Sequence, residues 1–168
     1  MTEAIARILV PVDFSPHSDR ALRYATRLAA WLGASMALVH VVDNPFASGA
    51  WTSEVYVPNL SQMLDDLIGD ATRRLTELMP VVSDHGVKVD VKVLTGQPAY
   101  TIIEHAHSGQ FDLIVMGTHG RTGFSHVLMG SVAEQVVRRA PCPVLTVRDI
   151  VPRFEEEWQT ASHHKTAA

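Results

Sequence analysis

The sequence predicts an α/β fold: a three-layer, open twisted sheet of five mainly parallel strands with helices on both faces. Five short runs rich in branched apolar residues alternate with four stretches of helical periodicity. Alternation of this kind implies parallel pairing through right-handed crossovers, which place helices on both faces of one sheet. A length of 168 residues suits one domain with a sizeable core, and no internal repeat or linker divides it.

The first strand and the first helix have clear local signals. RILVPVD, residues 7–13, is a branched apolar run typical of a buried parallel strand. The helix that follows spans residues 15–33. Ser15 can cap it, Pro16 suits its first turn and Gly33 can end it. Its apolar residues form a helical stripe, made of Leu22, Ala25, Leu28, Ala29 and Leu32.

The middle of the chain continues the alternation. A second strand spans residues 34–43, and residues 44–58 have no clear period and are interpreted as a loop. A long helix then spans residues 60–86. We expect Gly69 and Pro80 to disturb this helix.

Three strands and two helices complete the predicted fold. Residues 87–96 alternate in the manner of an edge strand, and residues 98–107 form a short helix. The last three elements are a strand at 111–117, a helix at 130–140 and a strand at 143–149.

Composition and charge exclude several classes of protein. A net charge of −4 gives no general attraction to nucleic acid or anionic lipid. The single cysteine, Cys142, excludes an internal disulfide framework, and a buried, inert thiol is expected there. An acid near the N-terminus, and the Pro and Asp that end its apolar run, argue against a signal peptide. We therefore expect a cytoplasmic protein with no nucleic acid partner and no membrane insertion.

A glycine-rich segment, GTHGRTGFSHVLMGS at 117–131, follows the fourth strand. Gly117, Gly120 and Gly130 have the spacing G-x2-G-x9-G, with a serine directly after the last. In open α/β sheets, ligands bind beyond the carboxyl ends of the strands, where the strand order reverses. If the first and fourth strands are neighbours, Asp13 and the glycine segment meet in one cleft.

The segment suits an anion such as phosphate. Gly130 and Ser131 open a helix, so their backbone N–H groups and the Ser131 hydroxyl could hold a negative charge. Gly117 and Gly120 would let the end of the strand pass close to a ribose or a phosphate. The alternative is an ordinary loop in which Gly130 only begins the helix and Ser131 caps it. Neither G-x4-G-K-[ST] nor a G-x-G-x-x-G after the first strand is present.

Three stretches have a familiar pattern: ILVPVDFSPHSDRALRYA, VHVVD and IVMGTHGRTGFSHVLMGSVAEQVVRRAPCPVLTVR. Through them, residues 6–148 resemble the universal stress protein family, and Gly-x2-Gly-x9-Gly-Ser resembles the signature of its ATP-binding branch. The resemblance implies a Rossmann-like fold, similar to the adenine nucleotide alpha hydrolases, with strand order 3-2-1-4-5. It also implies that ATP is the ligand. Because the glycine segment supplies few positive charges, we expect Mg²⁺ to bridge the phosphates.

The resemblance further implies twelve nucleotide-binding residues, with no catalytic residue and no metal ligand from the protein. Asp13 would accept hydrogen bonds from the ribose hydroxyls, and the main chain of Val41 would read the adenine edge. The others would line the adenosine pocket (Pro11, Val12), lie beside the nucleoside (Met116, Gly117) or surround the phosphates (His119, Gly120, Arg121, Gly130, Ser131, Val132). Two alternatives stay open: Asp13 as a cap of the following helix, and Arg121 as a solvated side chain.

Two classes of function are compatible with these residues. The first is a nucleotide-dependent regulatory or stress-response module that hydrolyses ATP slowly or not at all, and signals through its dimer or a regulatory protein partner. The second is an ATP-using enzyme of the same fold, such as a slow ATPase or a nucleotidyl transferase. The HIGH and KMSKS motifs of related adenylate-forming folds are absent. No nucleophile, base and orienting acid are visible together, so we favour the first class.

The resemblance also suggests how the chain is organised and assembled. Residues 1–149 would form the domain, and residues 150–168 a partly disordered C-terminal extension. The last strand, 143–149, would lie at a sheet edge and pair with its own copy in a homodimer. Phe154 and Trp158 in the extension could seal that interface.

Overall fold

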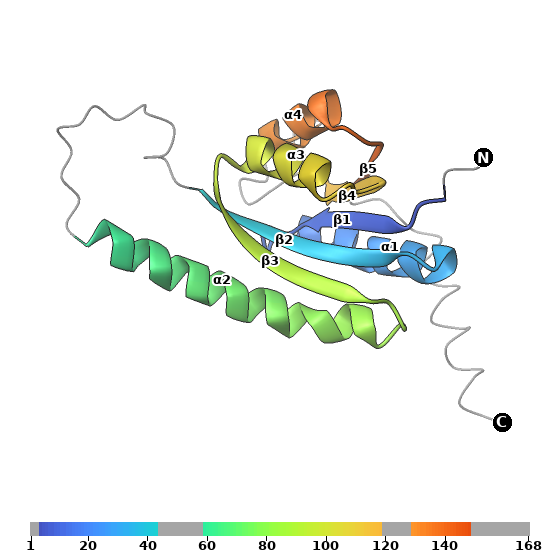
Figure 1. The fold of residues 1–168 in the computed structure, drawn as a ribbon, viewed down its shortest axis with the longest axis horizontal. Coiled ribbons are helices and arrows are strands. Elements are labelled where there is room, and N and C mark those ends of the chain that lie inside the picture. The colour runs from blue at the N-terminus through green and yellow to red at the C-terminus, as the bar shows by residue number, and fades with distance from the viewer. Residues whose placement is uncertain (1–3, 44–58, 119–128, 149–168) are drawn as a thin grey trace.

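The central feature of the structure is a parallel sheet with the strand order β3-β2-β1-β4-β5 (Figure 1). The computed structural model describes residues 4–43, 59–118 and 129–148, so the predicted loop at 44–58 and the extension at 150–168 lie outside the described residues. The strands are β1 (Arg7–Pro11), β2 (Ser35–Asp43), β3 (Val89–Gly96), β4 (Leu113–Gly117) and β5 (Val144–Val147). Every pairing between them is parallel, which confirms the predicted fold class and strand order.

Four helices cover the two faces of the sheet. They are α1 (Pro16–Leu32), α2 (Leu60–Ser83), α3 (Pro98–Ser108) and α4 (Ser131–Arg139). Residues of α1 and α2 pack in one hydrophobic core, and residues of α3 and α4 pack in a second core on the opposite face (Figure 1). The predicted elements therefore all exist, with ends that differ by a few residues.

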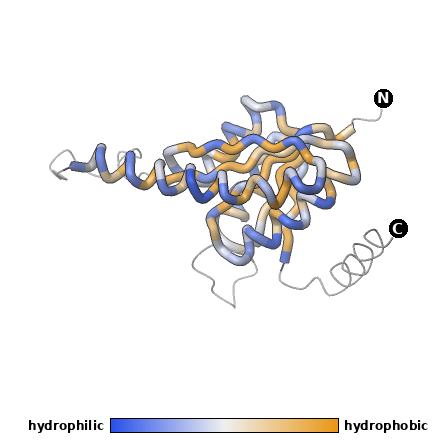
Figure 2. Tube along the Cα trace, turned by 90° about the horizontal axis from the view of Figure 1, so that it is seen from below, coloured by the Kyte–Doolittle hydropathy of each residue, from blue (hydrophilic) through white to orange (hydrophobic). Residues whose placement is uncertain are grey.

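Side chains of the strands alternate between these two cores. Ile8 and Val10 of β1 point toward α1 and α2, whereas Leu9 points toward α3 and α4. The strands are apolar along much of their length, as the hydropathy colouring in Figure 2 shows. A sheet buried on both faces explains why its strands have continuous apolar runs in the sequence.

The signals at the ends of α1 act as predicted. The Ser15 side chain accepts a hydrogen bond from the Ser18 N–H at 3.2 Å, which caps the helix. Pro16 is its first residue, and Gly33 ends it in the left-handed conformation with φ of 69°. These three residues fix where the helix begins and ends.

Helix α2 does not show the disturbance expected at Gly69 and Pro80. It is continuous for 24 residues from Leu60 to Ser83. The helix ends three residues after Pro80, so the missing N–H removes one hydrogen bond near the end of the helix. Its N-terminal part extends beyond the sheet (Figures 1 and 2). Among the helices of the described residues, none has both the length and the hydropathy to cross a bilayer.

The strand order reverses between β1 and β4. The two strands pair directly, with Ile8 opposite Leu113 and Leu9 opposite Ile114. The chain leaves β1 toward β2 on one side and returns to β4 on the other. Because all strands are parallel, their carboxyl ends meet at one edge, and this reversal is where a ligand crevice is expected.

Candidate functional site

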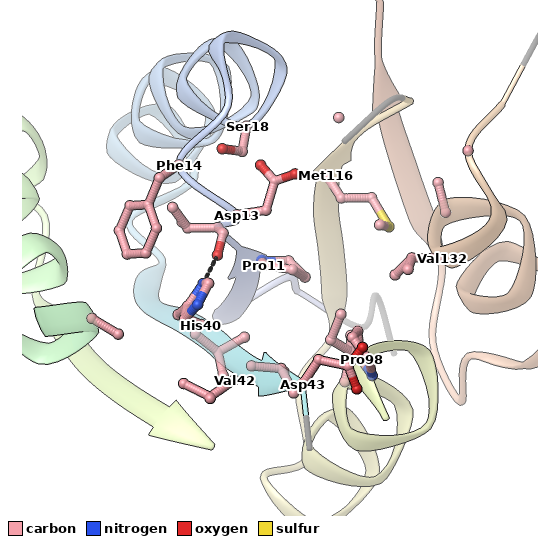
Figure 3. A pocket seen from close by; sticks show the side chains of 18 of the residues that line it. Pro11, Asp13, Phe14, Ser18, His40, Val42, Asp43, Pro98, Met116 and Val132 are labelled. Atoms are coloured by element: carbon pink, nitrogen blue, oxygen red, sulfur yellow. Dashed lines mark hydrogen bonds between the residues drawn. The ribbon is translucent and has the colours of Figure 1, made fainter. Parts of the chain in front are cut away.

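A cavity of about 660 Å³ opens at the carboxyl ends of β1, β2 and β4 (Figure 3). The beginnings of α3 and α4 form one wall, and the side of α2 forms another. Its volume is typical of small-molecule sites, which measure roughly 300–1,000 Å³. The cavity lies at the reversal of strand order, so position and size both mark it as the candidate site.

The cavity brings together nine of the twelve residues predicted from the sequence. They are Pro11, Val12, Asp13, Val41, Met116, Gly117, Gly130, Ser131 and Val132. The remaining three, His119, Gly120 and Arg121, lie outside the described residues.

Asp13 both lines the cavity and supports the beginning of α1. Its Oδ1 accepts hydrogen bonds from the backbone N–H of Ser15 at 3.0 Å and from the Ser15 hydroxyl at 2.6 Å. Figure 3 shows Asp13 between Ser18 of α1 and Met116 of β4. Asp13 therefore supports the cap of α1 indirectly, by accepting hydrogen bonds from the N-cap residue Ser15. The same hydrogen bonds fix the Asp13 carboxylate at the cavity wall.

The beginning of α4 differs from the expected anion site in one detail. The Gly130 N–H donates to the carbonyl of Thr118 at 2.7 Å, so it is already used. The first helical N–H groups, those of residues 131–133, have no partner within the helix, and among the described residues no side chain caps this end. These groups carry the positive end of the helix dipole into the cavity. The N–H groups without a partner in the helix therefore begin at Ser131, one residue after the first of the two predicted from the sequence.

The bond between Gly130 and Thr118 also joins two distant points of the chain. It brings the end of β4 and the beginning of α4 together across the segment that contains the predicted signature. The described ends of that segment are thus held at the cavity, even though residues 119–128 are not described.

Gly117 lies in a tightly packed part of the protein. A Cβ atom at this position would lie 3.0 Å from the backbone carbon and oxygen of His17 at the beginning of α1. Such a contact is tighter than most Cβ contacts in proteins, so a larger residue would need β4 and the beginning of α1 to move apart by a few tenths of an ångström. Gly117 lines the cavity, but its close neighbour is the protein backbone. The expectation that it also gives room for a ribose or phosphate stays a prediction.

Helix α2 contributes a wall of the cavity that was not predicted from the sequence. Phe14, Asp70 and Arg74 line the cavity on this side, together with His40 of β2. The guanidinium of Arg74 lies 3.9 Å from the centre of the Phe14 ring. A local signal existed for Arg74, because it lies three residues after buried Ala71 on the helix. No pattern in the sequence indicated that Phe14 would meet it.

His40 connects the ends of β1 and β2. Its ring is buried, and its Nδ1 lies 2.7 Å from the Val12 carbonyl oxygen. A carbonyl oxygen only accepts, so Nδ1 carries the hydrogen and donates it. The Val12 N–H in turn donates to the Val39 carbonyl at 2.8 Å. Both backbone groups of Val12 are therefore held by β2 at the floor of the cavity.

Cys142 lies before β5 and does not line the cavity, and it is half-buried instead of buried as expected. Burial raises the pKa of its thiol, and the nearby carboxylate of Asp112 raises it further. A raised pKa leaves less of the reactive thiolate at neutral pH. This agrees with the interpretation of Cys142 as an inert residue.

Known proteins with similar sequences and structures belong to one family. The model of the universal stress protein family matches residues 4–148. Universal stress protein MJ0531 of Methanocaldococcus jannaschii is 36% identical over 147 residues, which cover 84% of this chain and 81% of that protein. The solved structure of MJ0577 from the same organism superposes with a TM-score of 0.75 at 27% identity, covering 88% of this chain and 99% of that one. A universal stress protein solved in complex with cAMP has a TM-score of 0.64 at 24% identity, covering 86% of this chain and 98% of that one.

Proposed function

The chain belongs to the universal stress protein family, and from this premise we propose that it binds ATP in the cavity as a nucleotide-dependent regulatory or stress-response module. The observation that carries the proposal is the meeting of β1, β2, β4 and the uncapped beginning of α4 in one cavity of about 660 Å³. Solved relatives under 25% identity, including the cAMP complex, support the shared fold alone. The choice of ATP therefore rests on the residues of this chain and its glycine signature.

The adenine would be read by the backbone of Val41. The Val39 carbonyl accepts from Val12, so Val39 faces β1. Val41, two residues further along β2, faces the same side beyond the last ladder pair, Pro11 with Val39. It offers an N–H donor and a carbonyl acceptor side by side. Adenine presents the complementary acceptor and donor on N1 and N6, whereas guanine presents them in reverse.

The ribose and the phosphates would follow along the cavity. Asp13 can accept from ribose hydroxyls, because a carboxylate has several lone pairs and Ser15 uses Oδ1. The phosphates would reach the N–H groups at the beginning of α4 and the Ser131 hydroxyl. The predicted roles of His119, Gly120 and Arg121 around the phosphates remain part of the proposal.

Magnesium would arrive with the nucleotide. Within the described ranges, no group of three or more His, Cys, Asp or Glu side chains could hold a metal ion. Mg²⁺ commonly keeps several waters and binds through substrate phosphates. We therefore expect ATP affinity to fall when a chelator removes Mg²⁺. Equal affinity with and without chelator would contradict this part of the proposal.

Hydrolysis is expected to be slow. The described residues that line the phosphate end are Thr118 and the range 130–133, and none of them is a carboxylate, a histidine or a lysine. A general base near the attacking water is what fast hydrolysis requires. Steady-state phosphate release near the common enzyme rate of about 10 s⁻¹ would place the protein among ATP-using enzymes instead.

Signalling would pass through assembly. We propose a homodimer formed along β5, which is the outer strand beside β4, and a regulatory protein as a further partner. A nucleotide bound at the carboxyl ends of β1 and β4 would contact β4, which is the direct neighbour of the edge strand β5.

Mass spectrometry of the purified protein tests the proposed function directly. Under native conditions the mass should include a bound nucleotide, and denaturing conditions should release an adenine nucleotide of known mass. Calorimetry on nucleotide-free protein should then show that ATP binds more tightly than GTP, because only adenine matches the Val41 backbone. Equal affinities for the two, or no binding of either, would contradict the proposal.

A further inference from the structure

Phe14 has a backbone conformation that its residue type rarely adopts. Its φ is 63°, in the left-handed region where a Cβ atom is unfavourable. Conformations of this kind persist where the surrounding structure holds them, and they gather at functional sites. Phe14 directly follows Asp13 and lines the same cavity.

Two side chains from other elements hold the Phe14 ring. The His40 ring of β2 lies 4.6 Å from it between centroids, with an interplanar angle of 38°. The Arg74 guanidinium of α2 lies 3.9 Å from its centre, within the range of a cation–π contact. Figure 3 shows the Phe14 ring on the α2 side of the cavity, with His40 beside it. We call Arg74, Phe14 and His40 the stack.

The stack is adjacent to both residues proposed to hold the nucleoside. Phe14 follows Asp13 in the chain, and His40 precedes Val41. His40 also donates to the Val12 carbonyl at 2.7 Å, so a shift of its ring would move the chain just before Asp13. The outermost member, Arg74, is the only one of the three that belongs to a helix, and it therefore fixes the stack from outside the sheet.

We propose that Arg74 is a positioning residue for the nucleotide site: its guanidinium holds the Phe14 ring against His40 and so fixes the backbone that presents Asp13 and Val41. The inference rests on the proposed function. Arg74 acts through Phe14 and His40, and the nucleoside touches the residues that they place.

Arg73 provides a matched control on the same helix. It contacts Asp70 at 2.5 Å and Glu77 at 2.8 Å, whereas Arg74 reaches Asp70 only at 3.9 Å. Arg73 does not line the cavity. If nucleotide binding depended on the ion pairs along α2, Arg73→Gln should weaken it more than Arg74→Gln does. If nucleotide binding depends on the stack, Arg74→Gln should weaken it more.

The first measurement compares AMP and ATP by calorimetry. Arg74→Gln should weaken both by the same factor, roughly three- to tenfold, because the loss of a cation–π contact disturbs the nucleoside end alone. Arg73→Gln should bind both as the wild type does. A changed ratio of ATP to AMP affinity would mean that Arg74 contacts phosphate, and unchanged affinities would mean that it positions nothing. Either result overturns the inference.

The second measurement needs no nucleotide. In NMR spectra of the free protein, Arg74→Gln should shift the backbone amide signals of Asp13, Phe14 and Val41, and Arg73→Gln should leave them in place. Unshifted amides in Arg74→Gln overturn the inference even if affinity falls. If the wild type binds neither AMP nor ATP, the proposed function fails, and the amide shifts still decide whether Arg74 positions this backbone.

Discussion

Gly130 has an extended backbone, with φ of −71° and ψ of 154°, which any residue could adopt. The backbone conformation therefore does not require a glycine at this position. The position lies in the cavity wall, one residue before the N–H groups proposed to meet the phosphates.

Gly130→Val should consequently weaken ATP binding by about tenfold or more, which corresponds to about 1.4 kcal/mol or more. A branched side chain would occupy the space beside the phosphates. Gly130→Ala, with a single methyl group, should have a smaller effect. Calorimetry on both variants, with circular dichroism to establish that they fold, measures this. A folded Gly130→Val that binds ATP as the wild type does would remove the phosphates from the beginning of α4.

The folded structure shifts the pKa of His105 in α3. Burial lowers the pKa of His105, and the charges of Lys92 and Arg7 lower it further. Its ring also packs near Phe111, with 5.6 Å between centroids. The folded state thus favours neutral His105, while the unfolded chain protonates near the ordinary value of about 6.5. Between the two pKa values the unfolded state binds more protons, so stability falls as the pH drops from about 6.5 toward the folded pKa.

His105→Gln should remove this component of the acid sensitivity. The free energy of unfolding, measured with urea at pH 7.5 and pH 5, should decrease less on acidification in the variant than in the wild type. His107→Gln, which changes an exposed histidine on the same helix, is the matched control. An identical pH dependence in wild type and His105→Gln would contradict the assignment.

Residues with local roles were predictable, and residues with distant partners were not. Ser15, Pro16 and Gly33 act within one or two turns of their own helix, so their types and spacing were enough. Phe14 has a left-handed backbone and contacts His40 of β2 and Arg74 of α2. These partners are distant in the sequence, so no local pattern around Phe14 could predict the contacts. Asp13 was predictable as a site residue, because it follows directly on an apolar strand, but its bonds to Ser15 were not.

At the scale of elements, α2 shows how packing outweighs propensity. Gly69 lies inside the helix, is exposed, and would meet nothing within 4 Å if it carried a Cβ atom. The sequence indicated a disturbance of the helix at this point, since glycine costs about 1 kcal/mol relative to alanine in a helix. The helix is nevertheless continuous, because Ala71, Leu75 and Val82 are buried against the sheet on its far side.

Gly69→Ala should therefore raise the free energy of unfolding by about 0.5–1 kcal/mol. Gly33→Ala is an informative counterpart, because it also would meet nothing within 4 Å but has φ of 69°. Alanine is strained in that conformation, so this variant should lose stability by about 1 kcal/mol. Urea unfolding of both variants gives the comparison. Changes of the same sign would show that backbone conformation does not decide the outcome.

At the scale of the whole molecule, the two edges of the sheet differ. At one edge, β3 exposes Asp90 and Lys92, and charges of this kind protect an edge strand from further pairing. At the other edge, the three residues Val144–Thr146 of β5 are half-buried and uncharged. The strand order alone does not distinguish the two edges, but the charge of their residues does. The uncharged edge strand β5 is the one suited to pair with a second copy of the chain.

We therefore expect a homodimer along β5, and a lysine on this edge should prevent it. Thr146→Lys places a charge on β5, whereas Thr95→Lys places the same charge on the exposed face of β3. Light scattering at low micromolar concentration should give the dimer mass for wild type and Thr95→Lys, and the monomer mass for Thr146→Lys. A monomeric wild type, or a dimeric Thr146→Lys, would exclude β5 as the interface.

The C-terminal extension provides the last test of this assembly. Residues 150–168 lie outside the described residues, and all nine elements of the described ranges end by Val147. We propose that the domain ends at Asp149 and that Phe154 and Trp158 seal the dimer by burying apolar area. Truncation after Asp149 should then leave the free energy of unfolding of the monomeric Thr146→Lys variant within about 0.5 kcal/mol, the usual range for changes away from the core. In the wild-type background, the same truncation should raise the dimer dissociation constant by about tenfold or more, as expected when two aromatic side chains leave an interface. A truncated chain that dimerises as tightly as the full one would deny the extension a role in the dimer while leaving β5 as its interface.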